Sequence, residues 1–443
     1  MQLSKNKKFQ YLFFLIISIY IIFNGGNSNL LIQTNFILTS LLFFLSIKDK
    51  NYSKHLNLLF REYKLSILLY FLFLMYLLFQ IIPLPINILK LFSIEKFDIL
   101  DKLNFNSSYS PISLSPMNSF FQFLNFFTLM IFVFITKMIF YTERHQYRFY
   151  LFLSFFGALS SFFAIVLYLN GNPDFFFIKK LFYKDSATGF FINRTVFSIF
   201  LLFSLISSLQ YLKKDNFRKN NNIFFIKIYV RLAVIFITIG IITSFSRIGN
   251  FLLLITLFFY LINSFYLDKI KSRSFKYIIL LIILIDVFII GFYFGATELF
   301  DRFLFLKEEL VFTDENNQIL SRLDIINFGL KSAKDFYLFG YGSGSFEALF
   351  QLNNSISDDK FANHAHADLV EFIGEFGLIG SIFPLFVILN FFLRKEFFTF
   401  VNMILIIYIF IILLFDFSLH IPLIQTLFII FFIFNNRSSI QSD

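Results

Sequence analysis

Long apolar runs separated by short polar segments cover most of the chain, and each run is close to helix length. An α-helix needs about 20 apolar residues to cross the hydrocarbon layer of a bilayer, whereas a membrane β-strand needs only about 10 residues of alternating character. A soluble chain of 443 residues, 58% hydrophobic and 15% charged, could not bury this much apolar surface. Lipid can solvate it. The pattern therefore predicts an all-α polytopic membrane protein.

We expect about twelve transmembrane helices in a single integral membrane domain over residues 1–443. The first apolar run follows three lysines and resembles a signal peptide, but it lacks a small-residue cleavage site, which favours a retained span. The predicted spans are residues 9–23, 30–47, 65–82, 119–140, 149–169, 195–212, 226–245, 248–267, 277–297, 369–393, 397–415 and 419–435.

The positions of the basic residues predict the orientation of the chain. With the N-terminus inside, 24 of the 38 Lys and Arg residues fall in short cytoplasmic segments, which is the bias that the positive-inside rule describes. Both termini are then cytoplasmic, and the membrane is the inner membrane of a bacterial cell. We attribute the net charge of +10 to these basic residues in the cytoplasmic segments. Basic residues spread over short loops form no groove, so we expect no nucleic acid.

Two extracytoplasmic segments are longer than a connector needs to be. They are residues 83–118 and a large loop at residues 298–368, between helices nine and ten. Within the large loop, residues 318–335 place four apolar side chains on one face, which predicts an amphipathic helix at the membrane surface. These side chains are Ile319, Leu323, Ile326 and Leu330. A glycine turn follows at residues 340–344.

The entry to the tenth predicted span holds the densest set of polar residues. Glu371 and Glu375 lie one helical turn apart, so their mutual repulsion requires a cationic partner, a shared proton or water. His364 and His366 suggest a zinc pair, but residues two apart do not share a helical face and no third ligand is obvious. We therefore expect no metal and no cofactor. Glycines at every third position of residues 374–380 predict close helix packing.

Three arginines are predicted on the outer side of the membrane. Arg247 lies in a tight turn between two spans, Arg194 begins the sixth span and Arg322 begins the amphipathic segment. Each alone would more often anchor a helix at the interface. Together, beside the glycine turn and the histidines, they favour binding of a phosphate or diphosphate. Asp286, within the ninth span, is interpreted as a buried structural partner.

Five short elements, taken in order, resemble those of the bacterial O-antigen ligase and polymerase superfamily of integral membrane glycosyltransferases. With a sixth element described below, the resemblance covers about residues 111–435. Two of the five depart from the family: Thr195 replaces an Asn, and Ile325 or Ile326 replaces a Trp. The elements are residues 111–119, 189–195, 246–247, 321–344 and 416–422.

The sixth element, around the histidines, is the most telling. The family has a His followed by Asn, Ser or Gln, then nine residues, a Gly, two residues, and a Gly, Thr or Tyr. Counting back from Gly377 and Gly380 selects His366 rather than His364. Ala367 stands where Asn, Ser or Gln is usual, which removes one polar group beside the catalytic position.

The resemblance implies an enzyme that moves a glycan from an undecaprenyl-diphosphate carrier to a hydroxyl acceptor on the periplasmic face, without metal or nucleotide sugar and with inversion at the anomeric carbon. The expected acceptor is lipid A–core, so the expected partners are the carrier-linked donor, this acceptor and the bilayer. His366 would act as the general base. The expected substrate contacts are Arg247, Arg194, Arg322, Asn193, Ser246, Asp368, Glu371 and His420.

Two other functions stay open at this stage. A polymerase of the same superfamily would use a second carrier-linked repeat unit as the acceptor, and the sequence separates the two poorly because acceptor identity lies in irregular outer loops. A transporter or flippase would also be polytopic, but it should have pseudo-symmetric halves and a charged site at the midplane. Here the polar candidates concentrate on the outer side, which favours an enzyme.

Overall fold

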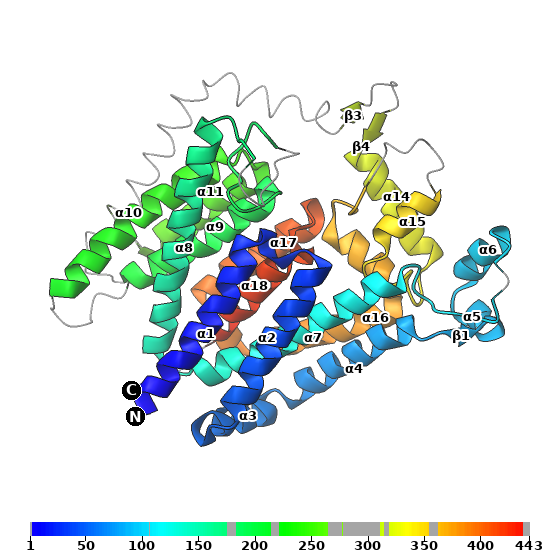
Figure 1. Ribbon diagram of the computed structural model, residues 1–443, viewed down its shortest axis with the longest axis horizontal. Coiled ribbons are helices and arrows are strands. Elements are labelled where there is room, and N and C mark those ends of the chain that lie inside the picture. The colour runs from blue at the N-terminus through cyan, green and yellow to red at the C-terminus, as the bar shows by residue number, and fades with distance from the viewer. Residues whose placement is uncertain are drawn as a thin grey trace.

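The computed structural model is almost entirely helical over the residues it describes, with long helices packed side by side (Figure 1). This is the architecture expected of an all-α polytopic membrane protein. The described residues are 2–105, 107–174, 183–213, 221–264, 277, 311–313, 319–353 and 362–436.

Eleven of the twelve predicted spans coincide with helices, whose ends differ from the prediction by a few residues. The ninth predicted span, which contains Asp286, lies outside the described residues apart from Tyr277. The matching helices are α1 (Gln2–Ile22), α2 (Asn29–Ile47), α4 (Lys64–Ile81), α7 (Pro116–Ile139), α8 (Glu143–Leu169), α9 (Arg194–Lys213), α10 (Asn221–Thr243), α11 (Arg247–Ile262), α16 (Asp368–Phe392), α17 (Phe400–Phe415) and α18 (Pro422–Phe434).

Seven of the described helices are long and apolar enough to cross a membrane, namely α2, α4, α7, α8, α9, α10 and α16. Helices α11, α17 and α18 are apolar but shorter, and α1 carries the N-terminal lysines in its first turns. These helices make the chain a multi-pass membrane protein. The total of twelve spans stays a prediction.

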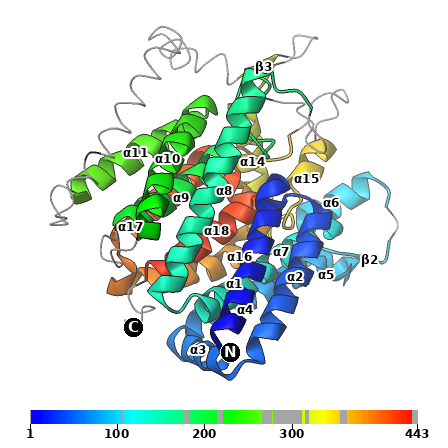
Figure 2. The ribbon, with the colours of Figure 1, turned by 60° about the vertical axis from the view of Figure 1, so that its left-hand side comes forward.

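Helix α9 is the most deeply buried of the seven, with 89% of its most apolar stretch inside the protein. It packs against α8, α10, α11 and α18, and Figure 2 shows α8, α9 and α10 side by side. Small residues permit this packing: Gly157 of α8 lies against Ser204, and Gly249 of α11 lies against Ser198. A side chain at either glycine would collide with the serine, so the helices approach as closely as small residues allow.

The second group of helices supports the start of α16. Helix α7 packs against α2, α4 and α18, and α4 runs along α16 (Figure 1). Helix α14 covers the other side of α16, and α17 contacts it as well. The first turns of α16 are therefore enclosed by segments that are far apart in the sequence.

Short elements fill the connections. In the first long outer segment, β1 pairs antiparallel with β2, and in the large loop β3 pairs antiparallel with β4. The elements are η1 (Asn24–Gly26), α3 (Lys50–Glu62), β1 (Leu84–Pro85), α5 (Ile86–Phe92), α6 (Ile94–Lys102), β2 (Tyr109–Ser110), β3 (Val311–Thr313), β4 (Ile319–Ser321), α14 (Arg322–Asp335), α15 (Phe346–Asn353), η4 (Lys395–Phe397) and η5 (Ser418–His420).

Helix α14 lies in the segment for which an amphipathic helix was expected. It begins at Arg322, because Ile319 belongs to strand β4. Ile325 and Gly329 face the protein, whereas Leu323 and Leu330 are exposed on the other side. Contact of this exposed face with the membrane surface stays a prediction.

Candidate functional site

The predicted site residues lie at or near the starts of α9, α11, α14 and α16 and in η5, between α17 and α18. Hydrogen bonds join several of these helix ends. The Ser246 hydroxyl donates to Thr195 Oγ1 (3.2 Å) between α11 and α9. The Asp368 backbone N–H donates to the Asp416 carbonyl (2.9 Å) between α16 and α17.

Helix α16 is interrupted at Gly377, where φ is +64° and ψ is −177°, a conformation that is almost exclusive to glycine. The break frees backbone groups that pair with the segment after α14. The Leu378 N–H donates to the Tyr337 carbonyl (2.8 Å), and the Tyr341 N–H donates to the Gly374 carbonyl (3.0 Å). A Cβ on Gly377 would collide with the backbone of this segment. The large loop is thereby fixed to the start of α16.

Every backbone N–H of the glycine turn at residues 340–344 is already hydrogen-bonded within the protein. The Gly342 N–H donates to the Glu375 carbonyl (3.2 Å), and the Ser343 N–H donates to Gln80 Oε1 (3.3 Å). The Gly344 N–H donates to the Glu375 carboxylate (2.7 Å). The turn therefore binds a carboxylate of α16. Its N–H groups are all occupied within the protein, so they do not bind a substrate phosphate as the sequence had suggested.

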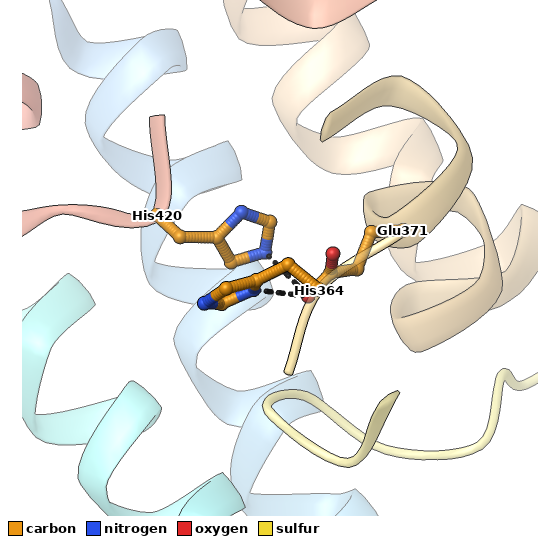
Figure 3. A group of neighbouring side chains, drawn as sticks. All are labelled: His364, Glu371 and His420. Atoms are coloured by element: carbon orange, nitrogen blue, oxygen red, sulfur yellow. Dashed lines mark hydrogen bonds and ion pairs between the residues drawn. The ribbon is translucent and has the colours of Figure 1, made fainter. Parts of the chain in front are cut away.

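Two histidines from separate segments converge on the carboxylates of α16, as Figure 3 shows for His364 and His420 around Glu371. Nδ1 of His364 lies 2.9 Å from Glu371 Oε1, and Nε2 of His420 lies 3.4 Å from the same oxygen. Nε2 of His420 also lies 4.0 Å from Glu375 Oε2. Its Nδ1 is hydrogen-bonded to Asp368. The spacing of the glutamates required a cationic partner, a shared proton or water, and the structure places His420 beside both carboxylates.

This network is almost completely buried: the exposed fractions are 0% for Asp368, 2% for Glu371, 1% for Glu375 and 4% for His420. Burial alone would lower the pKa of His420, but the carboxylates of Glu371 and Asp368 outweigh it and raise the pKa to about 10. The ring is therefore a cation at neutral pH. Three residues expected to contact substrate, Asp368, Glu371 and His420, instead face one another inside the protein.

His366 lies beside the network in a different environment. Its backbone φ of +57° is left-handed, which is uncommon for a residue other than glycine and is a kind of strain that concentrates at functional sites. Its ring meets Phe417 edge-on at 5.3 Å, whereas the ring of His364 stacks flat on Phe417 at 4.8 Å. Nδ1 of His366 is buried and has no hydrogen bond to any residue that the structure describes.

Arg322, at the start of α14, is brought close enough to His366 to change its titration. Burial lowers the pKa of His366 to about 4, and the positive charge of Arg322 acts in the same direction. The His366 ring is therefore neutral at physiological pH and can accept a proton. Arg322 also interacts electrostatically with Asp416, just beyond α17. The neutral imidazole of His366 and the guanidinium of Arg322 therefore lie close enough to interact, although they come from two separate parts of the chain.

The remaining predicted contacts form a second group at the starts of α9 and α11, namely Asn193, Arg194, Ser246 and Arg247. Asn193 Oδ1 accepts from the Thr195 N–H (2.6 Å), and Ser246 Oγ accepts from the Gly249 N–H (3.1 Å). Both side chains therefore satisfy the first amide groups of a helix, as N-caps do. Capping accounts for Asn193 and Ser246 without a substrate.

Gly25 of η1 connects the segment before α9 with the segment that carries His420. Gly25 of η1 lies between Phe191, which precedes α9, and Ile421, which follows His420. The guanidinium of Arg194 lies over the Tyr183 ring at 5.1 Å. Arg194 and Arg247 begin neighbouring helices whose ends meet through Ser246.

Residues 232–385 match the model of the family described as O-antigen ligase. This match supports the resemblance to the O-antigen ligase and polymerase superfamily. The matched region runs from α10 through most of α16 and contains Arg247, Arg322 and His366, whereas Arg194 and His420 lie outside it. A comparison with curated proteins found no match.

The match supports glycosyl transfer of the ligase or polymerase type in general. The matched region includes the contact between α14 and α16.

Two residues of the candidate site were missed in the sequence. Gln80 is completely buried at the end of α4, and its Nε2 donates to the carbonyls of Phe339 (2.8 Å) and Glu375 (2.9 Å). A polar amide in an apolar run was the available signal, because such groups need partners at membrane depth. Phe417, between the two histidines, gave no signal, because only the fold brings its ring to them.

Proposed function

We propose that this protein transfers a glycan from an undecaprenyl-diphosphate carrier to a hydroxyl group of lipid A–core, on the periplasmic face of the inner membrane. The proposal rests on one observation: burial and the nearby Arg322 lower the pKa of His366 and keep its ring neutral, and both residues lie inside the region matched by the family. The reaction needs one group that accepts a proton and another that holds negative charge. An imidazole and a guanidinium offer these two properties.

In the proposed step, the acceptor oxygen attacks the anomeric carbon of the donor sugar on the face opposite the diphosphate. The new carbon–oxygen bond forms as the bond to the diphosphate breaks, so the anomeric configuration inverts. The hydroxyl proton moves to His366, and the carrier leaves as undecaprenyl diphosphate. Since diphosphate is a good leaving group, the step requires neither a general acid nor a metal ion, and no nucleotide sugar.

The low pKa of His366 would make it a weak base in the empty site, because a base is most effective when its pKa is close to the working pH. Part of the lowering comes from the charge of Arg322. A diphosphate bound to Arg322 would offset that charge and raise the pKa of His366 towards its ordinary value of about 6.5. We therefore propose that donor binding strengthens the base at the moment it is needed.

The three arginines are not equally well supported as diphosphate contacts. Arg322 is the first choice for the diphosphate, because it acts directly on His366. Arg247 and Arg194 are proposed as further phosphate contacts, since a planar guanidinium can hold two phosphate oxygens at once. The buried Asp368, Glu371 and His420 are proposed to support the segment that carries His366.

A polymerase is the second candidate, because the superfamily includes both activities. The chemical step would be the same, with a hydroxyl of a second carrier-linked repeat unit as the acceptor. A transporter or flippase is disfavoured because the family match supports glycosyl transfer.

The glycans of a deletion strain would separate these functions. A ligase predicts that all carrier-derived glycan disappears from lipid A–core, and that the wild-type chain restores it while a His366→Ala chain does not. A single repeat unit left on lipid A–core would instead identify a polymerase. Carrier-linked units trapped on the cytoplasmic face would identify a flippase and overturn the proposal.

A further inference from the structure

The buried network beside His366 contains four donor atoms of the kinds that bind transition metals. They are Nδ1 of His364, Nε2 of His420, Oε1 of Glu371 and Oε2 of Glu375. The first three lie within 4.8 Å of one another, and Figure 3 shows the rings of His364 and His420 directed at the carboxylate of Glu371. They come from the segment before α16, from α16 and from η5, so the cluster joins three separate parts of the chain.

The separations of these atoms fit a small tetrahedral ion. In such a site, bonds of about 2.0–2.2 Å place neighbouring donor atoms about 3.3 Å apart. From Glu371 Oε1 the distances are 2.9 Å to His364 Nδ1 and 3.4 Å to His420 Nε2. From His420 Nε2 the distance to Glu375 Oε2 is 4.0 Å. These three separations lie on either side of the ideal value, and the donor atoms of His364, Glu371 and His420 all lie within 4.8 Å of one another.

Backbone amides hold the carboxylates in this orientation. Oε2 of Glu371 accepts from the Ala365 N–H (2.7 Å), and Oε1 of Glu375 accepts from the Gly344 N–H (2.7 Å). In each case one oxygen is held by the backbone while the other points to the centre of the cluster. Ligands held by such outer hydrogen bonds are typical of metal sites.

His420 has the same arrangement and provides an independent sign of a missing ligand. Its Nδ1 is bonded to Asp368, whose other oxygen accepts from the Leu419 N–H (2.8 Å). In known metal sites, a histidine that binds the metal through one ring nitrogen commonly donates a hydrogen bond from the other nitrogen to a carboxylate. Nε2 of His420 is buried and forms no hydrogen bond with the residues described, although it points into the cluster. Phe372 stacks on its ring at 4.4 Å and restricts the access of water.

We propose that His364, Glu371, Glu375 and His420 bind one zinc ion. Two imidazoles with two carboxylates suit zinc better than magnesium or calcium, which prefer oxygen ligands alone. Four protein donors leave no open position for water, so the ion is structural and takes no part in the transfer step.

The ion would fasten the segment before α16 to α16 and η5, and thereby fix His366, two residues from the ligand His364. Sequence spacing did not predict this set, because His364 lies near His420, which is distant in the sequence, and not beside a ligand of its own segment. The inference is independent of the proposed transfer reaction, since zinc binding is measured without substrate.

Zinc analysis of the purified full-length protein in detergent tests the proposal. The protein is stripped with EDTA, given excess zinc, separated from free metal, and analysed for zinc per chain. Affinity is measured by competition with a zinc-binding dye. We expect one zinc per chain and a higher Tm with zinc. His364→Ala should lower the affinity by more than about 100-fold, and Asp368→Asn by about 10–100-fold, as for an outer-shell partner.

His366→Ala is the matched control, because it removes a neighbouring histidine that is not a ligand, and it should keep one zinc. His364 is 23% exposed, so its replacement tests the site with little risk to folding. The proposal is overturned if the wild-type protein retains no zinc. It is equally overturned if His364→Ala and His366→Ala lose zinc to the same extent, which would mean unspecific binding.

Discussion

His364 and His366 are separated by a single alanine, yet their rings lie in different environments. In an extended chain, side chains two residues apart point the same way, but the left-handed backbone at His366 redirects its ring. His364 lies flat on Phe417 and contacts Glu371, whereas His366 meets the edge of Phe417 and is affected by the charge of Arg322. Their substitution should therefore have different effects.

Replacing His366 with Ala should reduce the turnover number by about 10²–10⁴-fold, which is the usual contribution of a positioned general base. Donor affinity should change little, because the arginines that hold the diphosphate are still present. The measurement uses purified protein, a carrier-linked donor and an acceptor, and records product per unit time.

His364→Ala is the comparison, and its turnover number should fall much less, because His364 contacts Glu371 rather than the reacting groups. An inactive His364→Ala with an active His366→Ala would mean that the motif register is wrong by two residues. Full activity of both variants would remove the general base from the mechanism.

Arg322→Lys should lose much of the activity although the positive charge is kept. A guanidinium can bind two phosphate oxygens in one plane, whereas an ammonium group is a single point of charge. If Arg322 only anchors α14 at the interface, a lysine would extend to the same surface equally well. Transfer rates at matched membrane levels decide this, and near-normal transfer by Arg322→Lys would exclude a diphosphate contact.

At the scale of elements, the break in α16 makes the large loop and the helix one unit. Gly377 interrupts the helix at the point where the Leu378 N–H donates to Tyr337 and the Tyr341 N–H donates to Gly374. The carboxylates of Glu371 and Glu375 lie in the turns just before this break. A change at Gly377 should therefore disturb stability and the site together.

Gly377→Ala should destabilise the protein more than Gly171→Ala. Both glycines have positive φ, so alanine is strained at either position, at a cost of about 1–3 kcal/mol. Gly171 has open space around it, whereas a Cβ at Gly377 would strike the backbone of Leu338 and Gly340. Thermal unfolding in detergent should show a clearly lower Tm for Gly377→Ala. Equal shifts for the two variants would mean that the close approach contributes nothing.

At the scale of the whole molecule, sequence patterns predicted the helices well and their contacts poorly. Hydropathy and length locate a span, because each helix satisfies its own backbone within one segment. Contacts between distant segments leave no local pattern, so the pairing of Glu371 with His420 and the bonds from Gln80 to Glu375 were not predicted. Likewise, Ile319 has the spacing of a helix but pairs in a strand with β3.

The orientation of the whole molecule can be tested with two cysteines on either side of α16, because the native chain has none. The charge count predicts that Gln351, in the large loop, lies outside and that Glu396, between α16 and α17, lies inside. Both residues are exposed, whereas Ser343 in the glycine turn is only 1% exposed and would not react. An impermeant thiol reagent on intact spheroplasts should label Gln351→Cys and leave Glu396→Cys unlabelled until the membrane is opened. Labelling of Glu396→Cys alone would place His366 on the cytoplasmic side, where the proposed carrier-linked donor and lipid A–core could not meet it.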